Sequence, residues 1–168
     1  MRKCKKNEEA TRRWGEKARG RKGDGAKGRI VAKSQSRSLK KQSMSEKIRT
    51  HKDLKVYQLS FEAGMEVFKI TKMFPKEEKY SLTDQIRRSS RSVSGNLAEA
   101  FRKRRYPKYF VAKLTDSEGE AAETQVWLEY AFACGYIEKE IHDKLFDKYD
   151  HIISMIVNMS NNPDKWSF

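Results

Sequence analysis

The chain has 168 residues, with 37 Lys and Arg against 23 Asp and Glu, a formal net charge of +14, and 37% apolar residues. This composition can fill one modest core, but it contains no run of about 18 apolar residues and so excludes a transmembrane helix. The basic N-terminus lacks the apolar segment of a secretory signal. We therefore expect a cytoplasmic protein that makes no membrane contact.

Residues 1–50 form a basic leader with 18 basic and 5 acidic side chains. A segment with so few large apolar residues cannot bury enough surface to offset the entropy lost on ordering, so the leader is predicted to be disordered. Three interpretations stay open. The leader is an arm that binds nucleic-acid phosphates, a solvated tail without a task, or a segment upstream of the true translation start at Met44.

The first two helices are predicted from apolar spacing and from their ends. One extends from Asp53, which serves as its cap, to Phe74, where Pro75 ends it. The next begins at Ser81, which is expected to form a capping box with Asp84. The apolar stripes of these two helices are Leu54, Tyr57, Phe61, Gly64 and Phe68, and then Leu82, Ile86, Val93, Leu97 and Phe101.

The last two helices follow short breaks. Pro107 is expected as the first residue of the third helix, and Gly135 is expected to end it in the left-handed conformation. The fourth helix extends from about Glu138 to Ser160. Their inward residues are predicted to be Phe110, Leu114, Ser117, Ala121, Thr124, Leu128 and Ala131, and then Ile141, Leu145, Tyr149, Ile152, Ile156 and Met159.

Four long helices joined by short loops are expected to pack as neighbours with opposite directions. No segment alternates in the manner of a strand. The sequence therefore predicts an all-α protein, an antiparallel up-down-up-down four-helix bundle over residues 51–161, with a C-terminal tail at 162–168.

Polar residues form a second row on the helix that begins at Ser81, and an acidic row follows on the next helix. Ser92 and Asn96 favour helices poorly, so their place inside a helix suggests that packing or hydrogen bonds hold them. We expect Arg88 and Asn96 to face carboxylates of the third helix; the alternative is two solvated faces. The predicted structural polar network contains Gln85, Arg88, Ser92, Asn96, Glu99, Glu120 and Glu123.

Charge is also sorted along the folded part, since residues 87–108 hold eight cations and one carboxylate, whereas residues 116–150 hold ten carboxylates and three lysines. The basic segment suits the C-terminal end of its helix, and with Tyr106 and Tyr109 it also suits phosphates and unpaired bases. The residues predicted to bind nucleic acid are Arg87, Arg88, Arg91, Arg102, Lys103, Arg104, Arg105 and Lys108.

Several motifs together resemble one family. Leu82-Thr83-Asp84-Gln85-Ile86-Arg87-Arg88 and Asn96-Leu97-Ala98-Glu99 are similar to the signature helix of the bacterial proteins encoded in intervening sequences of 23S ribosomal RNA genes. Glu123-Thr124-Gln125 and Cys134-Gly135-Tyr136-Ile137 extend the resemblance, which covers about residues 51–160. One departure is Ala100, where the family usually has Gly.

The resemblance implies a homopentamer of helical bundles. It also implies kinship with the accessory variability determinant proteins of diversity-generating retroelements, which bind RNA and a reverse transcriptase. The expected partners are therefore other copies of the chain, RNA and a reverse transcriptase. The activity of the intervening-sequence proteins is not implied by the resemblance, so an element-encoded protein of little host function remains an alternative.

Enzyme motifs are absent from the sequence. It has no Glu-x-x-His pair, no phosphate-binding glycine loop and no nucleophile elbow, and Cys4 and Cys134 are too far apart for a metal clip. We expect no catalytic residues, no metal and no cofactor. The favoured interpretation is a non-catalytic, oligomeric, RNA-associated protein, and the main alternative is a protein-interaction scaffold.

Overall fold

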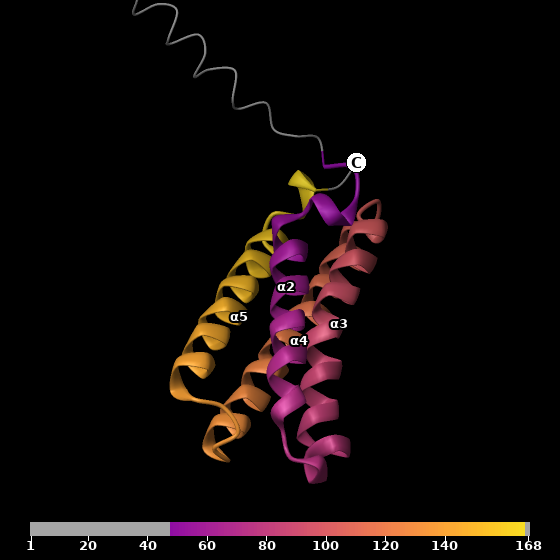
Figure 1. Ribbon diagram of the computed structural model, residues 1–168. Coiled ribbons are helices and arrows are strands. Elements are labelled where there is room, and N and C mark those ends of the chain that lie inside the picture. Colours follow the sequence, from indigo (N-terminus) through magenta and orange to yellow (C-terminus); the bar gives the residue numbers. More distant parts are fainter. Residues whose placement is uncertain (1–47, 167–168) are drawn as a thin grey trace, which may run out of the picture. The chain divides into compact units, whose positions relative to one another are not determined.

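The computed structural model describes residues 48–166 (Figure 1). The predictions of a disordered leader and of a start at Met44 fall almost wholly outside this range. The described part contains the long helices α2 (Lys55–Ile70), α3 (Leu82–Lys103), α4 (Pro107–Ala133) and α5 (Lys139–Ser160), and no strand. Short 3-10 turns complete it: η2 (His51–Asp53), η3 (Thr71–Met73), η4 (Lys76–Tyr80) and η5 (Pro163–Lys165). The predicted all-helical fold with four helices is confirmed.

The ends of α2 differ from the prediction. Asp53 does not cap α2; its carboxylate accepts the backbone N–H groups of Arg49 at 2.9 Å and Thr50 at 2.8 Å, and thereby holds the turn before the helix. These backbone bonds lower the pKa of Asp53. At the other end, α-helical bonding stops at Ile70 and the chain tightens into η3, so Phe74 and Pro75 follow a 3-10 turn.

The capping box predicted for α3 is wrong. Ser81 precedes the helix, but its hydroxyl donates to the carboxylate of Glu78 and not to the backbone of α3. The same carboxylate accepts the N–H of Leu82 at 3.3 Å and the hydroxyl of Tyr136 at 3.1 Å. Glu78 therefore takes the capping role from outside the helix, and these bonds, chiefly the one from Ser81, lower its pKa.

The ends of α4 are as predicted. Pro107 occupies its first turn, where a missing N–H costs nothing. Gly135 follows the helix with φ 73°, a conformation that side-chain-bearing residues rarely adopt. The N–H of Tyr136 bonds to the carbonyl of Ala131 and that of Gly135 to Phe132, each at 2.9 Å, which is a Schellman ending.

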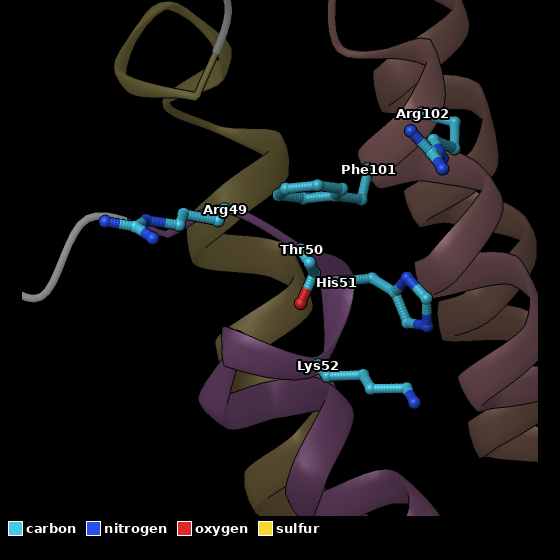
Figure 2. Close-up of a pocket in the computed structure, with 6 residues that line it drawn as sticks. All are labelled: Arg49, Thr50, His51, Lys52, Phe101 and Arg102. Carbon is cyan, nitrogen blue, oxygen red and sulfur yellow. The ribbon is translucent and has the colours of Figure 1, made fainter.

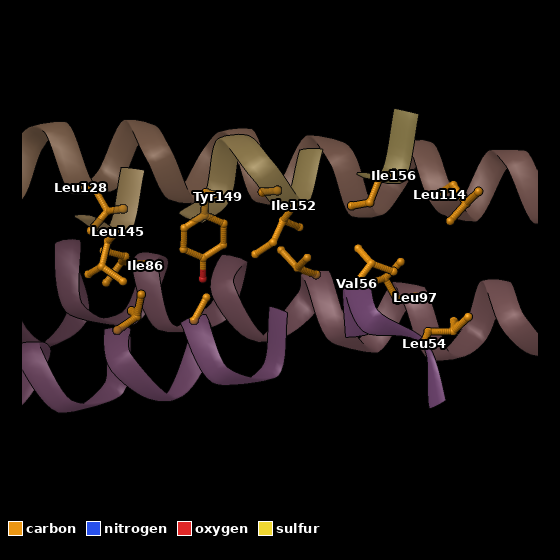
Figure 3. Packing of buried hydrophobic residues seen from close by; sticks show 14 of the residues in the cluster. Leu54, Val56, Ile86, Leu97, Leu114, Leu128, Leu145, Tyr149, Ile152 and Ile156 are labelled. Atoms are coloured by element: carbon orange, nitrogen blue, oxygen red, sulfur yellow. The ribbon is translucent and has the colours of Figure 1, made fainter. Parts of the chain in front are cut away.

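The predicted inward faces are correct on α3 and α4, where every residue of both stripes is buried. On α5 the prediction fails only at Ile141, which is 38% exposed. Figure 3 shows side chains of α2, α3, α4 and α5 meeting in one core, with Tyr149 reaching into its centre. Burial raises the pKa of the Tyr149 phenol.

The predicted stripe of α2 is displaced by one position. Phe61 is 55% exposed, and the residues that α2 buries are Val56, Ser60, Ala63 and Val67. This row has the same spacing as the predicted one, so periodicity alone could not choose between them. Two members of the predicted row still meet the rest of the fold, since Leu54 is buried and a Cβ on Gly64 would lie 3.4 Å from the carbonyl oxygen of Ser90 in α3.

Ion pairs join the outer sides of α2 and α5. The amine of Lys148, whose side chain is only 16% exposed, lies 2.6 Å from Glu66 and 3.0 Å from Glu62. Lys144 adds a second contact to Glu66 at 3.1 Å. Opposite charges on these two helices are therefore matched across the contact.

Candidate nucleic-acid interface

The eight cations predicted to bind nucleic acid lie in three different surroundings. Arg87 and Arg91 are on the side of α3 that faces α2, with their guanidinium carbons 5.1 Å and 5.8 Å from the ring centre of Phe68. Arg87 also donates to the hydroxyl of Thr71 at 2.7 Å. Arg87 is therefore half-buried against α2, whereas Arg91 lies near Phe68 but remains exposed.

Arg88 is exposed on the side of α3 that faces α4. Its charge acts on Glu120, whose pKa is nevertheless raised, first by partial burial and then by the neighbouring carboxylate of Glu123. Arg88 forms no ion pair within 4.0 Å among residues 48–166. It lies near the acidic residue Glu120 of α4.

The third group surrounds the turn between α3 and α4. We call it the basic turn and define it as Arg102, Lys103, Arg104, Arg105 and Lys108. Arg102, Arg105 and Lys108 are exposed. Lys103 lies 2.6 Å from Glu99.

Arg104 has a structural place within the basic turn. Its guanidinium carbon is 3.7 Å from the ring centre of Phe101, and it donates to the carbonyl of Phe101 at 2.7 Å. Partial burial, followed by the positive charges of Arg102 and Arg105, lowers the pKa of Arg104. The effect of these neighbours shows that the three arginines of the basic turn lie close together.

Two exposed tyrosines accompany the basic turn. Tyr106 and Tyr109 are 63% and 65% exposed, and their rings meet edge to face at 6.2 Å between centres. Exposed aromatic faces beside cations are the residue types that stack bases and neutralise phosphates in single-stranded nucleic-acid sites. The arrangement can therefore hold a polyanion that carries planar groups.

The predicted polar network is built differently. Between α3 and α4, the ion pair joins Glu99 to Lys113 at 3.1 Å, so the carboxylate comes from α3 and the cation from α4. Bonds from Lys103 and Lys113 lower the pKa of Glu99. Ser92 and Asn96 are half-buried, and no hydrogen bond of their side chains is found in the described part of the chain. Arg88 therefore lies near the carboxylate of Glu120 without an ion pair within 4.0 Å, and Asn96 makes no side-chain hydrogen bond, among residues 48–166.

Other members of that network also have local roles. Glu123 accepts the indole N–H of Trp127 at 3.0 Å within α4, and Gln85 is half-buried. The buried polar contacts between α3 and α4 come instead from Ser117, which donates to the carbonyl of Val93, and from Thr124, which donates to the hydroxyl of Ser89, each at 2.9 Å. The hydroxyls of Ser117 and Thr124 belong to the predicted buried stripe of α4 and not to the predicted polar network.

Several residues near the basic turn were not predicted from the sequence as candidate binding residues. A cavity of about 200 Å³ lies between the start of the first helix and the end of α3, lined by Arg49, Thr50, His51, Lys52, Phe101 and Arg102 (Figure 2). Its two sides are about fifty positions apart in the chain, and no local pattern connects them. Of the residues that line this cavity, only Arg102 is among those predicted to bind nucleic acid.

Residues 48–166 contain neither a metal-binding cluster nor a membrane-spanning helix. This part of the chain holds no group of three or more His, Cys, Asp and Glu side chains arranged to bind a metal ion. It also holds no helix that is both long and apolar enough to cross a bilayer.

Comparison with known proteins gives the family. The profile of the 23S rRNA-intervening sequence protein family matches residues 52–158, well over half of the chain. The chain belongs to this family. The match spans all four long helices, so the family resemblance noted in the signature helix is confirmed.

A solved structure supports this membership in the 23S rRNA-intervening sequence protein family. The chain is similar to a protein with unknown function from the S23 ribosomal protein family of Bacteroides thetaiotaomicron, with 26% sequence identity and a TM-score of 0.58. The similarity covers 62% of this chain and 97% of that one. No curated protein matches the chain.

Proposed function

We propose that this protein of the 23S rRNA-intervening sequence family is a non-catalytic, self-associating RNA-binding protein whose basic turn contacts RNA phosphates. The observation that carries the proposal is the basic turn itself, because three exposed cations lie together with two exposed tyrosines. Phosphate neutralisation by Lys and Arg supplies sequence-independent affinity, and the aromatic rings add stacking.

The proposal includes an antiparallel up-down-up-down bundle that assembles into a homopentamer. Opposite directions of α3 and α4 are supported by two bonds, since Ser117 pairs with Val93 whereas the later Thr124 pairs with the earlier Ser89. Assembly is supported by exposed apolar side chains on α2 and α4. Phe61 and Met65 are 55% and 42% exposed, and Val126 and Tyr130 are 46% and 55% exposed.

Self-association would raise RNA affinity without new contacts in the subunit. Several copies of the basic turn on one particle attract a polyanion more strongly than one copy, because a strand that leaves one site is held near the next. The affinity would then fall steeply as salt concentration rises.

The proposal is tested by removing exposed cations of the basic turn. Arg102→Ala together with Lys108→Ala should weaken binding of a single-stranded RNA about tenfold, and the slope of log affinity against log salt should fall by about 0.7 for each lost phosphate contact. Fluorescence anisotropy at several salt concentrations gives both quantities. The matched control is Lys69→Ala with Lys76→Ala, which removes two exposed lysines elsewhere. Equal affinity and slope for both double variants contradict the proposal.

A protein-interaction scaffold, such as a reverse-transcriptase accessory subunit, is the second candidate. It is favoured by the exposed apolar residues of α4, because surfaces of this kind commonly mark protein contacts. Sedimentation of the purified protein with and without RNA separates the two. An oligomer that does not change its sedimentation with RNA favours the scaffold.

A further inference from the structure

Unlike the basic turn, the cavity between η2 and α3 has walls on two sides. Figure 2 shows the side chains of His51 and Lys52 extending from η2 toward α3, where Phe101 and Arg102 lie. The guanidinium group of Arg49 extends away from Phe101 in this view. Lys52 and Arg102 thus bring positive charge to one cavity from segments about fifty positions apart.

The walls of this cavity are held in place by contacts of their own. Asp53 accepts the N–H groups of Arg49 and Thr50, which fixes the turn, and the amide of Gln58 donates to the carbonyl of Lys52 at 2.8 Å. The imidazole of His51 meets Tyr57 edge to face at 4.7 Å between ring centres. The position of His51 and Lys52 therefore does not depend on a ligand.

The opposite wall is equally fixed. Phe101 is 5% exposed, and the guanidinium group of Arg104 lies against its ring. Arg102 projects from the same last turn of α3 and is exposed. A buried aromatic ring with cations on its neighbours gives a rigid wall with positive potential.

No carboxylate lines the cavity. Within residues 48–166, neither Lys52 nor Arg102 has an acidic partner within 4.0 Å. The nearest acid along the chain, Asp53, uses its carboxylate on backbone N–H groups and lies on a second, apolar cavity with Met155 and Trp166. The charges of Lys52 and Arg102 are thus left for an anion.

The volume of the cavity and the positive charges that line it indicate which kind of anion fits. A cavity of about 200 Å³ is smaller than the roughly 300 to 1,000 Å³ of sites that enclose whole small-molecule ligands. It suits one phosphate group whose remaining chain lies outside. A phosphate monoester carries a charge of about −1.5 to −2 and presents three free oxygens, whereas an internal diester carries a single charge. The two cations Lys52 and Arg102 match the monoester better.

We propose that this cavity binds the terminal phosphate monoester of an RNA strand whose following nucleotides extend over the basic turn. This inference rests on the proposed RNA binding and adds a preference for one end of the strand. Arg102 is shared between the two sites. Lys52 belongs to the cavity alone.

The test compares two RNA strands of the same sequence, one with a 5′-phosphate and one with a 5′-hydroxyl, both labelled at the 3′ end. The full chain should bind the phosphorylated strand about tenfold more tightly. Lys52→Ala should remove this preference and leave affinity for the hydroxyl strand unchanged. Lys55→Ala removes an exposed lysine three residues away that lies outside the cavity, so it should keep the preference.

Inorganic phosphate alone separates this inference from the proposed function. Binding of phosphate to the full chain, followed by calorimetry, should be lost in Lys52→Ala and kept in Lys55→Ala. If RNA binds but both strands bind equally, the terminal-phosphate site is overturned and the proposed function stands. If no RNA binds while Lys52→Ala abolishes phosphate binding, the cavity remains a phosphate site, but the proposed function and the RNA end as its ligand both fail.

Discussion

The contact between α2 and α5 and the basic turn are both rich in charge, yet they use it in opposite ways. At the first, Lys144 and Lys148 are matched by Glu62 and Glu66. At the second, Lys103 pairs with Glu99, which also pairs with Lys113, and the side chains of Arg102, Arg105 and Lys108 are exposed. The same residue types therefore join two helices in one region and lie on an exposed surface in the other.

The largest effect on folding is expected where charge is matched. Glu66→Ala leaves Lys148 partly buried without its nearest partner, and we expect the free energy of unfolding to fall by about 1 to 2 kcal/mol. Urea denaturation measures it. Glu129→Ala is the control, since Glu129 is an exposed helical carboxylate without an ion pair among the described residues. A loss equal to that of the control would show that the pairing adds nothing.

A change in pH is expected to have an intermediate effect on the free energy of unfolding. Burial raises the pKa of Glu66, but hydrogen bonds from Lys148 and Lys144 outweigh it, so the pKa lies below the usual value of 4.5. Because the folded-state pKa is depressed, the stabilisation is complete above about pH 4.5 and is lost as pH falls through the folded-state pKa. Part of the acid destabilisation, about 1 kcal/mol, should disappear in Glu66→Gln when both proteins are denatured with urea between pH 3 and pH 7. Identical pH profiles would rule out this origin.

The smallest effect is expected where charge is unmatched. Arg102→Ala with Lys108→Ala should change the free energy of unfolding by no more than about 0.5 kcal/mol, because exposed side chains away from packed features contribute little. Thermal and urea denaturation of the RNA-free protein measure this. A clear loss of stability would mean that the basic turn holds the fold together, and it would weaken its assignment to a ligand.

Helix number and most helix ends follow from local rules, and those parts of the prediction are correct. Gly135 ends α4 because the left-handed conformation suits glycine, and Pro107 begins it because the first turn needs no N–H. The cap of α3 lies four residues before Leu82, within local reach, but the capping-box pattern indicated Ser81 and Asp84 instead. Its carboxylate, Glu78, comes from the preceding 3-10 turn and also bonds Tyr136 from after α4.

The candidate site was predicted only in part. The cations at the end of α3 are nearly continuous in the sequence, so their clustering could be predicted from the sequence alone. Arg87 and Arg91 could not be assigned this way, because their distance from Phe68 depends on how α2 packs. Lys52 and Phe101 line one cavity although no spacing rule relates them.

The sequence by itself determined four amphipathic helices, their breaks and the concentration of positive charge near residue 105, because these depend on backbone propensities and on neighbours within a few residues. Only the tertiary structure decided which of two equally spaced rows α2 buries, which cations are matched, and which segments enclose the phosphate-sized cavity. Those outcomes depend on the close approach of helices, where a single methyl group or carboxylate changes the packing.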